Sequence, residues 1–246
     1  MNAVDDSRPR ADLEAIGRAT TELVETVYGS VTVIRDAFLE LWTRMSAEGA
    51  MPGSTDFASL ATVIHSELSA KAALLNGAGV VLADHVLPDR ARHLEWWHPT
   101  TTGASEAQRL VVDLNPRSEY FYDYTHMEWF AVPRDQDRRW ICGPYLDYTG
   151  VDLYVCTFSM PLRLADGTFL GIAGADISIS TIESALWPYL QQASATLVLA
   201  NADGRVIVGN DAEYLTGLRV GATARTERAV TVRATPWSLI VVRTAG

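Results

Sequence analysis

The chain has 246 residues, with 20 Lys and Arg against 30 Asp and Glu, so its formal net charge is −10 and its sequence pI is about 4.9. This balance argues against a nucleic-acid-binding surface, and no basic stripe compensates for it. Hydrophobic residues make up 48% of the chain, an ordinary share for a globular protein of one large or two small domains. The two cysteines, Cys142 and Cys156, are too few for a disulfide framework, so we expect buried free thiols.

The first ten residues are polar and precede a long amphipathic segment. Residues 1–10 are predicted to be a disordered leader, without the apolar core of a secretory signal. From 11 to 50, apolar residues recur at spacings of three and four, which predicts one long helix that Gly49 ends. No apolar run approaches the roughly 20 residues of a membrane span. We therefore expect a soluble protein located in the cytoplasm.

One apolar stripe runs along this predicted helix. Its members are Leu13, Ile16, Leu23, Val27, Val31, Ile34, Phe38, Leu41 and Met45. A stripe of this length is hard to cover with the rest of a small chain, so we expect a homodimer formed through the helix. The alternative is a helix that packs only on its own domain.

A second helix and several strands follow. Ser54 or Thr55 is expected to cap a helix over 56–75, and Asn76-Gly77 to stop it. The polar segment 100–108 is expected to be a loop. The apolar runs that predict strands on either side of it lie at 79–83, 92–97 and 110–114.

The remaining elements are mostly strands. After an aromatic-rich loop with a short helix at 120–133, strands are predicted at 140–145, 151–162 and 169–177. A helix over 177–191 is expected to be capped by Ser180 or Thr181. Two short hairpins then complete the chain, with strands at 195–200, 205–208, 228–234 and 237–243.

Five short motifs follow one another in the middle of the chain. They are Trp129-Phe130-x-x-Pro133, Pro144-Tyr145-Leu146-Asp147, Thr157 to Pro161, Asp166-Gly167 and Gly171 to Ile177. In this order and spacing they resemble the ligand-binding module of Cache sensor domains, the extracytoplasmic sensors of many chemoreceptors and histidine kinases. The resemblance covers about residues 115–180.

The resemblance implies an α+β fold, with a long N-terminal helix and a PAS-like antiparallel sheet. Residues 54–192 are then the ligand-binding Cache module. Residues 194–246 are too few for a full second module, so they are expected to form a smaller, reduced PAS-like module that leans on the first.

The resemblance also implies a set of ligand-binding residues. In amino-acid-binding Cache modules a Tyr, an Arg five residues later and then a Trp form one ligand wall, and two aspartates hold the ligand ammonium. The corresponding positions and their neighbours here are Tyr122, Met127, Trp129, Phe130, Tyr145, Asp147 and Asp176. Met127 stands where that family has its Arg. A thioether cannot make the paired hydrogen bonds that Arg gives a carboxylate.

The implied pocket is aromatic and acidic, which favours an amine or a quaternary ammonium compound. We therefore expect a non-enzymatic sensor that binds such a metabolite and signals to a separate effector protein. One alternative is a sensor of an amino acid or small carboxylate that uses Arg92, Arg117 or His126. Another is a structural dimerisation module without a ligand.

Motifs of catalysis and metal binding are missing from the sequence. It contains no nucleophile elbow, no His-Glu-x-x-His and no phosphate-binding loop. Asp147 and Asp176 have no second catalytic element beside them in the sequence, which argues against a hydrolase. His93 and His98 lie five residues apart with no cysteine nearby, a poor metal spacing. We expect no enzyme, no cofactor and no metal.

Overall fold

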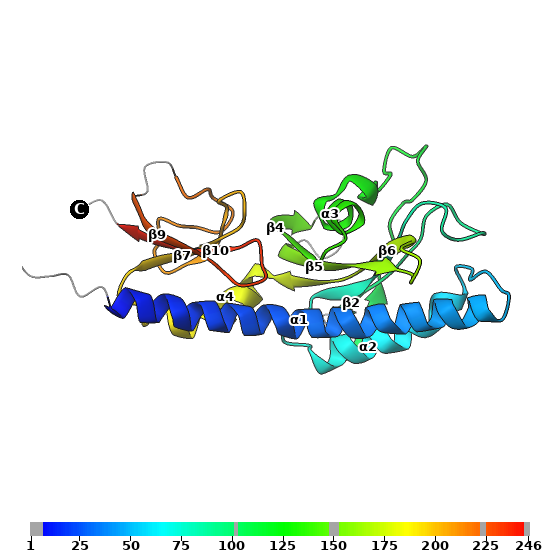
Figure 1. Ribbon diagram of the computed structural model, residues 1–246, viewed down its shortest axis with the longest axis horizontal. Helices are drawn as coiled ribbons and strands as arrows, with labels where there is room; N and C mark the ends of the chain where they lie inside the picture. The colour runs from blue at the N-terminus through cyan, green and yellow to red at the C-terminus, as the bar shows by residue number, and fades with distance from the viewer. Residues whose placement is uncertain (1–6, 101–102, 148–152, 222–224, 244–246) are drawn as a thin grey trace, which may run out of the picture.

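The computed structural model describes residues 7–100, 103–147, 153–221 and 225–243. One long helix, α1 (Ser7–Ala47), runs beneath two antiparallel sheets (Figure 1). Its 41 residues span about 60 Å at a rise of ~1.5 Å per residue. Because the helix begins at Ser7, residues 7–10 are helical and the prediction of a leader over them is wrong. Among the described residues, no helix is both long and apolar enough to span a membrane.

The larger sheet has six strands in the order β3-β2-β1-β6-β5-β4. In chain order they are β1 (Gly77–Leu82), β2 (Leu94–Thr100), β3 (Gly103–Arg109), β4 (Trp140–Asp147), β5 (Leu153–Arg163) and β6 (Phe169–Ser178). Helices α1 and α2 (Leu60–Ala70) cover one face of this sheet, and α3 (Glu128–Gln136) lies on the other (Figure 1).

The third strand differs from the prediction. The polar segment 103–109 pairs with β2 as the edge strand β3, whereas 110–114 is not a strand. An edge strand does not need an apolar pattern, since one of its sides has no partner strand. The alternating Leu110, Val112 and Leu114 instead pack as a loop against the hydrophobic cluster on the α3 face of the sheet. The alternation therefore reflects a half-buried loop.

The helix boundaries also differ from the prediction at two places. α2 ends at Ala70, five residues before the predicted end, and a 3₁₀ turn at Asp56–Ser59 precedes it. The cap of α4 (Ile179–Leu190) is Ser178, which accepts a hydrogen bond from the Thr181 backbone N–H at 3.1 Å. The predicted caps, Ser180 and Thr181, lie inside the helix.

The smaller sheet has four strands in the order β8-β7-β10-β9. They are β7 (Thr196–Ala200), β8 (Val206–Gly209), β9 (Arg225–Thr231) and β10 (Ser238–Arg243). This sheet lies along the N-terminal half of α1, and the larger sheet lies along the C-terminal half (Figure 1). Trp237, which is fully buried, joins the two by packing edge-on against Phe158 of β5 at 6.0 Å.

The apolar stripe of α1 packs on the chain's own sheets. Val27, Val31 and Ile34 are all 0% exposed, and Tyr28 packs edge-on against Phe158 at 5.4 Å. Two sheets laid end to end cover the helix that a single small domain would leave bare. The reasoning that assigned this stripe to a dimer interface is therefore wrong. The outward face of α1 is mostly polar, with Val33 exposed by 45%, and a homodimer stays a prediction.

Candidate functional site

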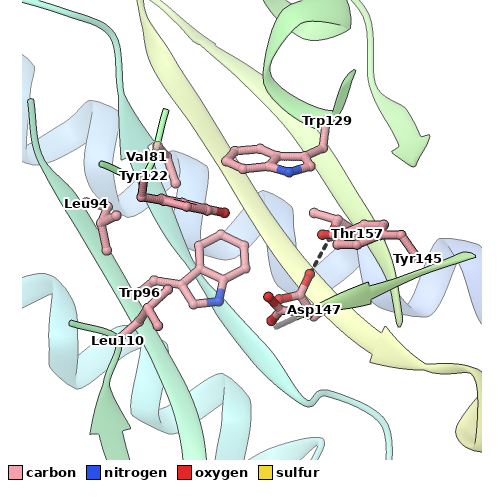
Figure 2. Close-up of a pocket in the computed structure, with 10 residues that line it drawn as sticks. Val81, Leu94, Trp96, Leu110, Tyr122, Trp129, Tyr145, Asp147 and Thr157 are labelled. Carbon is pink, nitrogen blue, oxygen red and sulfur yellow. Dashed lines mark hydrogen bonds between the residues drawn. The ribbon is translucent and has the colours of Figure 1, made fainter. Parts of the chain in front are cut away.

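A small pocket lies on the α3 face of the larger sheet. It is enclosed by the sheet, by α3 and by the loop that follows β3 (Figure 2). The residues that line it are Val81, Leu94, Trp96, Leu110, Tyr122, Trp129, Tyr145, Asp147, Thr157 and Asp176. Seven of the ten come from five of the six strands, so the pocket depends on the register of the whole sheet.

Five of the seven residues implied by the sequence line this pocket. They are Tyr122, Trp129, Tyr145, Asp147 and Asp176. β4 ends at Asp147, and β6 carries Asp176 opposite Thr157 of β5. Trp129 lies in the first turn of α3 and is 7% exposed. The motifs therefore identified both acidic groups and three of the rings.

Met127 and Phe130 do not line this pocket, and their part in ligand binding stays a prediction. Met127 is the N-cap residue of α3 in extended conformation, and it is 42% exposed. It borders a neighbouring hollow, between α3 and the smaller sheet, which shares Trp129 and Tyr145 with the pocket. Phe130 is 1% exposed and packs against Tyr124 and Phe169 in the core. Consecutive helix residues point about 100° apart, so Trp129 and Phe130 cannot both face the pocket.

Sequence reasoning missed five lining residues, of which Trp96 and Thr157 are the most informative. Leu94 and Trp96 alternate on one predicted strand, so the sequence did indicate that they share a face. Trp96 lies close to the sheet because glycines stand beneath it. A Cβ at Gly77 would come within 2.9 Å of the Trp96 indole nitrogen, and one at Gly174 within 3.1 Å of its ring.

Asp176 is a buried carboxyl group with hydrogen-bonding partners. It is 5% exposed, and Thr157 Oγ1 donates to its Oδ1 at 2.6 Å. The Tyr145 hydroxyl lies 2.5 Å from the Thr157 hydroxyl. Because Thr157 gives its one hydroxyl proton to Asp176, Tyr145 donates to Thr157. A chain of hydroxyls therefore leads from the pocket wall to the carboxylate.

Burial raises the pKa of Asp176 to about 7, because the charged form is poorly solvated there. The Thr157 hydrogen bond and the Trp96 indole lower this pKa, whereas the charge of Asp147 raises it further. Near neutral pH the site thus holds a carboxyl group that is only partly ionised. Strongly perturbed carboxyl groups in a pocket are typical of functional sites.

Aromatic rings make up most of the remaining wall. Figure 2 shows Trp96, Tyr122, Trp129 and Tyr145 arranged around a common space, with Asp147 beside it. The cavity has a volume of about 30 Å³, enough for roughly two water molecules. A larger ligand requires part of the wall to move. Leu110 and Tyr122 are half-buried and belong to the loop between β3 and α3, so they are the natural part to move.

The basic groups considered as carboxylate anchors lie elsewhere. Arg92 forms ion pairs with Asp84 at 2.9 Å and Asp123 at 3.0 Å. Arg117 is exposed, and the His126 side chain is 85% exposed. None of these three lines the pocket.

The histidines do not form a metal site within the part of the chain that the structure describes, where no group of three potential ligands occurs. His93 and His98 are both buried. Burial lowers the pKa of His93 to about 4, so this ring is neutral at physiological pH. Cys142 and Cys156 are free thiols.

The sequence of the larger module matches one described family. Residues 72–184 match the family of methyl-accepting chemotaxis protein-like, first PDC sensor domains. These residues form a PDC sensor domain. The family consists of sensor domains of the Cache type and not of enzymes, as the sequence motifs indicated. No curated protein matches the chain.

Solved structures show the same fold over nearly the whole chain. The periplasmic sensory domain of the Campylobacter jejuni chemoreceptor Tlp1 has a TM-score of 0.65 at 10% identity, covering 96% of this chain and 93% of that one. A methyl-accepting chemotaxis protein X has a TM-score of 0.61 at 13% identity, with 94% and 97% covered. These similarities confirm the predicted α+β fold of a long helix and two sheets.

A third similar structure contains a ligand. The ligand-binding domain of the C. jejuni chemoreceptor Tlp3 in complex with L-valine has a TM-score of 0.51 at 11% identity, with 99% of this chain and 98% of that chain covered. At this identity the PDC fold is what the two proteins share. The chemistry of the pocket here is therefore argued from its own residues.

Proposed function

We propose that this PDC sensor domain binds a small cation, either an amine or a quaternary ammonium compound, in the pocket around Asp176. The observation that supports this is the charge of the lining: among its ten residues two are carboxyl groups, Asp147 and Asp176, and none is basic. An ionised carboxylate in a dry site is costly unless a cation pairs with it. A bound ammonium group supplies that cation.

The aromatic wall suits the same ligand. Each ring face that meets a cation contributes ~0.5–2 kcal/mol, and more when water is excluded. Trp96 and Trp129 are 5% and 7% exposed, so contact with their faces takes place out of water. Asp176 then pairs with the ammonium group while the rings surround its carbon substituents.

An amino acid is the main alternative, because the Tlp3 domain was solved with L-valine. In the pocket described here, its carboxylate would meet rings and two aspartates. An unpaired charge in such a site costs several kcal/mol. We therefore propose that this domain prefers an amine over the amino acid from which the amine derives.

Matched ligand pairs test the proposal. Isothermal titration calorimetry is run with isobutylamine against L-valine, which differ only by the carboxylate, and with tetramethylammonium as a quaternary probe. We expect binding of the two cations and at least about tenfold weaker binding of valine, which corresponds to ~1.4 kcal/mol. Tighter binding of valine would refute the proposal and point to donors in the loop between β3 and α3.

We further propose that binding is passed along α1 to a separate effector, since α1 packs against both sheets. The homodimer and the cytoplasmic location also stay proposals. Light scattering with and without isobutylamine tests the oligomeric state, and fractionation of cells that express the protein tests the location. A protein that stays monomeric at ~10 µM with the amine present excludes a tight dimer as the signalling form.

A further inference from the structure

A second hollow lies far from the sensor pocket, between the N-terminal half of α1 and the hairpin of β9 and β10. Its volume is about 580 Å³, within the ~300–1,000 Å³ typical of small-molecule sites. One wall is the face of α1 from Arg10 to Glu22, and the other is the segment from Arg228 to Arg233. We refer to this hollow as the arginine groove.

The charges that line the arginine groove are predominantly positive. Arg10, Arg18, Arg228 and Arg233 face two acids, Glu14 and Glu22. Arg10 is paired with Glu14 at 3.2 Å. Within the described part of the chain, the side chains of the other three arginines form no hydrogen bond or ion pair, although Arg233 lies near enough to Glu25 to lower its pKa.

Several arginines elsewhere in the described chain pair with acids. Arg92 binds Asp84 and Asp123, and Arg163 binds Asp137. Arg18, Arg228 and Arg233 line one concave surface without such partners, so their guanidinium groups are available to a ligand. Guanidinium groups match the geometry of carboxylates and phosphates, with which they form paired hydrogen bonds.

The net charge of the smaller module has the opposite sign to that of the rest of the chain. Residues 194–246 contain six Arg and four acidic residues, a net charge of +2. Residues 1–193 then hold the other 14 basic and 26 acidic side chains, a net charge of −12. An anion that approaches the molecule is repelled by most of its surface and attracted to this end.

The floor of the arginine groove is apolar. It includes Leu13, Val232 and Leu239, which are 6%, 3% and 1% exposed. Val230 at the rim is 43% exposed and adds apolar surface. A purely inorganic anion leaves this floor in water, whereas an anion with a short hydrocarbon part covers it.

We propose that the arginine groove binds a small organic anion, whose carboxylate or phosphate group pairs with Arg228 and Arg233 and whose apolar part lies on the floor. The site is independent of the cation pocket, since no residue lines both. The sensor thus has one site for a cation in its larger module and one for an anion in its smaller module.

Chemical-shift titration of the isotope-labelled protein tests this proposal, with hexyl phosphate and sodium hexanoate as probes and hexanol and inorganic phosphate as controls. We expect saturable shifts in β9, β10 and the first half of α1 with at least one organic anion. Both controls are expected to bind at least about tenfold more weakly. An absence of saturation with both organic anions at millimolar concentration overturns the proposal, and equal binding of inorganic phosphate overturns the role of the floor.

Two double variants distinguish direct pairing of the anion with Arg228 and Arg233 from the general electrostatic attraction of the molecule. Arg228→Gln with Arg233→Gln is expected to weaken binding of the effective probe at least tenfold. Arg44→Gln with Arg219→Gln makes the same change in net charge at exposed positions outside the groove, and is expected to change binding less than twofold. Equal loss in both double variants overturns the site. Stabilisation by isobutylamine in both variants shows that the cation pocket is intact, so the two proposals are judged separately.

Discussion

The two sheets of this protein differ in the polarity of the side chains that they bury. The larger sheet and its connections bury His93, Glu95, His98, Thr157, Ser159, Asp176 and Ser178. Among the described residues of the smaller module, the buried side chains are all apolar, from Leu197 in β7 to Val242 in β10. The buried polar groups of the larger sheet lie on both of its faces, since His93 packs against Phe57 on the side of α1 and α2 and Asp176 lines the pocket on the side of α3.

Buried polar groups cost free energy unless they are hydrogen-bonded, and a buried ionisable group costs more. The larger sheet tolerates this cost at the pocket, where Asp176 is held by Thr157. The smaller module contributes mostly apolar burial, and among its described residues the one buried side-chain nitrogen or oxygen without a hydrogen bond is the indole nitrogen of Trp237. We infer that the stability of the larger sheet depends on pH and on the bound cation, whereas the smaller sheet responds to neither.

The largest effect is expected from a change in α1, because it removes the support of both sheets at once. Ile34 is 0% exposed in the shared core, so Ile34→Asp buries an unpaired charge and is expected to cost more than ~4 kcal/mol. Val33→Asp, at the neighbouring position that is 45% exposed, is the control and is expected to change stability by less than ~0.5 kcal/mol. Urea unfolding followed by circular dichroism measures both. If the native protein is a dimer and Ile34→Asp is a folded monomer, the stripe is instead a dimer interface.

The second-largest effect is expected on the pH dependence of stability, and it comes from Asp176 in the larger sheet. Its pKa of about 7 lies above that of an ordinary Asp, about 3.9. The group therefore favours folding at acid pH, and that contribution is lost as pH rises through about 7. Asp176→Asn does not ionise, so above about pH 8 it is expected to be more stable than the native protein by a few kcal/mol. This corresponds to a rise of several degrees in Tm.

The same variant is expected to lose the ligand. Removing one partner of a buried ion pair costs ~2–5 kcal/mol, so isobutylamine is expected to bind at least about 30-fold more weakly. Asp166→Asn makes the same charge change in the exposed turn between β5 and β6, and serves as the control for both measurements. If Asp176→Asn unfolds the protein at all pH values, Asp176 is a structural residue and not the ligand carboxylate.

The pH dependence of binding is the third test. A cation binds the ionised form of Asp176, so its affinity is expected to fall about tenfold per pH unit below the pKa of about 7 and to level off above it. Calorimetry in buffers of different protonation enthalpy measures the proton released on binding. The Asp176→Asn protein is expected to show weak binding that does not change with pH. Constant affinity of the native protein between about pH 5 and 8 would contradict the assignment.

The sequence predicted the acids of the pocket because they follow a family pattern along the chain. Asp147 and Asp176 come from motifs whose spacing is visible without a structure. Strand alternation likewise indicated that Leu94 and Trp96 share a face. Local patterns of this kind supplied the order of helices and strands and the nature of the pocket.

The contacts across strands were not predictable in the same way. Trp96 meets Asp176 only because β1 lies between β2 and β6, and this sheet order is a long-range property. Leu110 alternates like a strand residue but belongs to a packed loop. Met127 occupies the family's Arg position, yet it caps α3 with its side chain outside the pocket. Register, packing and side-chain direction decided these three cases.

The smallest effect is expected from Trp96, the ring that the motifs missed. Trp96→Phe keeps an aromatic face but removes the indole N–H that lowers the pKa of Asp176. The pKa is then expected to rise further, and isobutylamine to bind about fivefold more weakly near neutral pH, a loss of ~1 kcal/mol. Above about pH 8 most of this loss is expected to disappear, because Asp176 is ionised in both proteins.

A matched variant at the next position distinguishes this role from general packing. The Trp97 indole donates to Glu95 at 2.8 Å, and Trp97 does not line the pocket. Trp97→Phe therefore removes an equivalent N–H from the same strand without touching Asp176. It is expected to lower stability slightly and to leave the pH midpoint of amine binding unchanged, whereas Trp96→Phe moves that midpoint upward. An equal shift in both variants would assign the effect to the packing of β2, and an unmoved midpoint in Trp96→Phe would show that the indole does not act on Asp176.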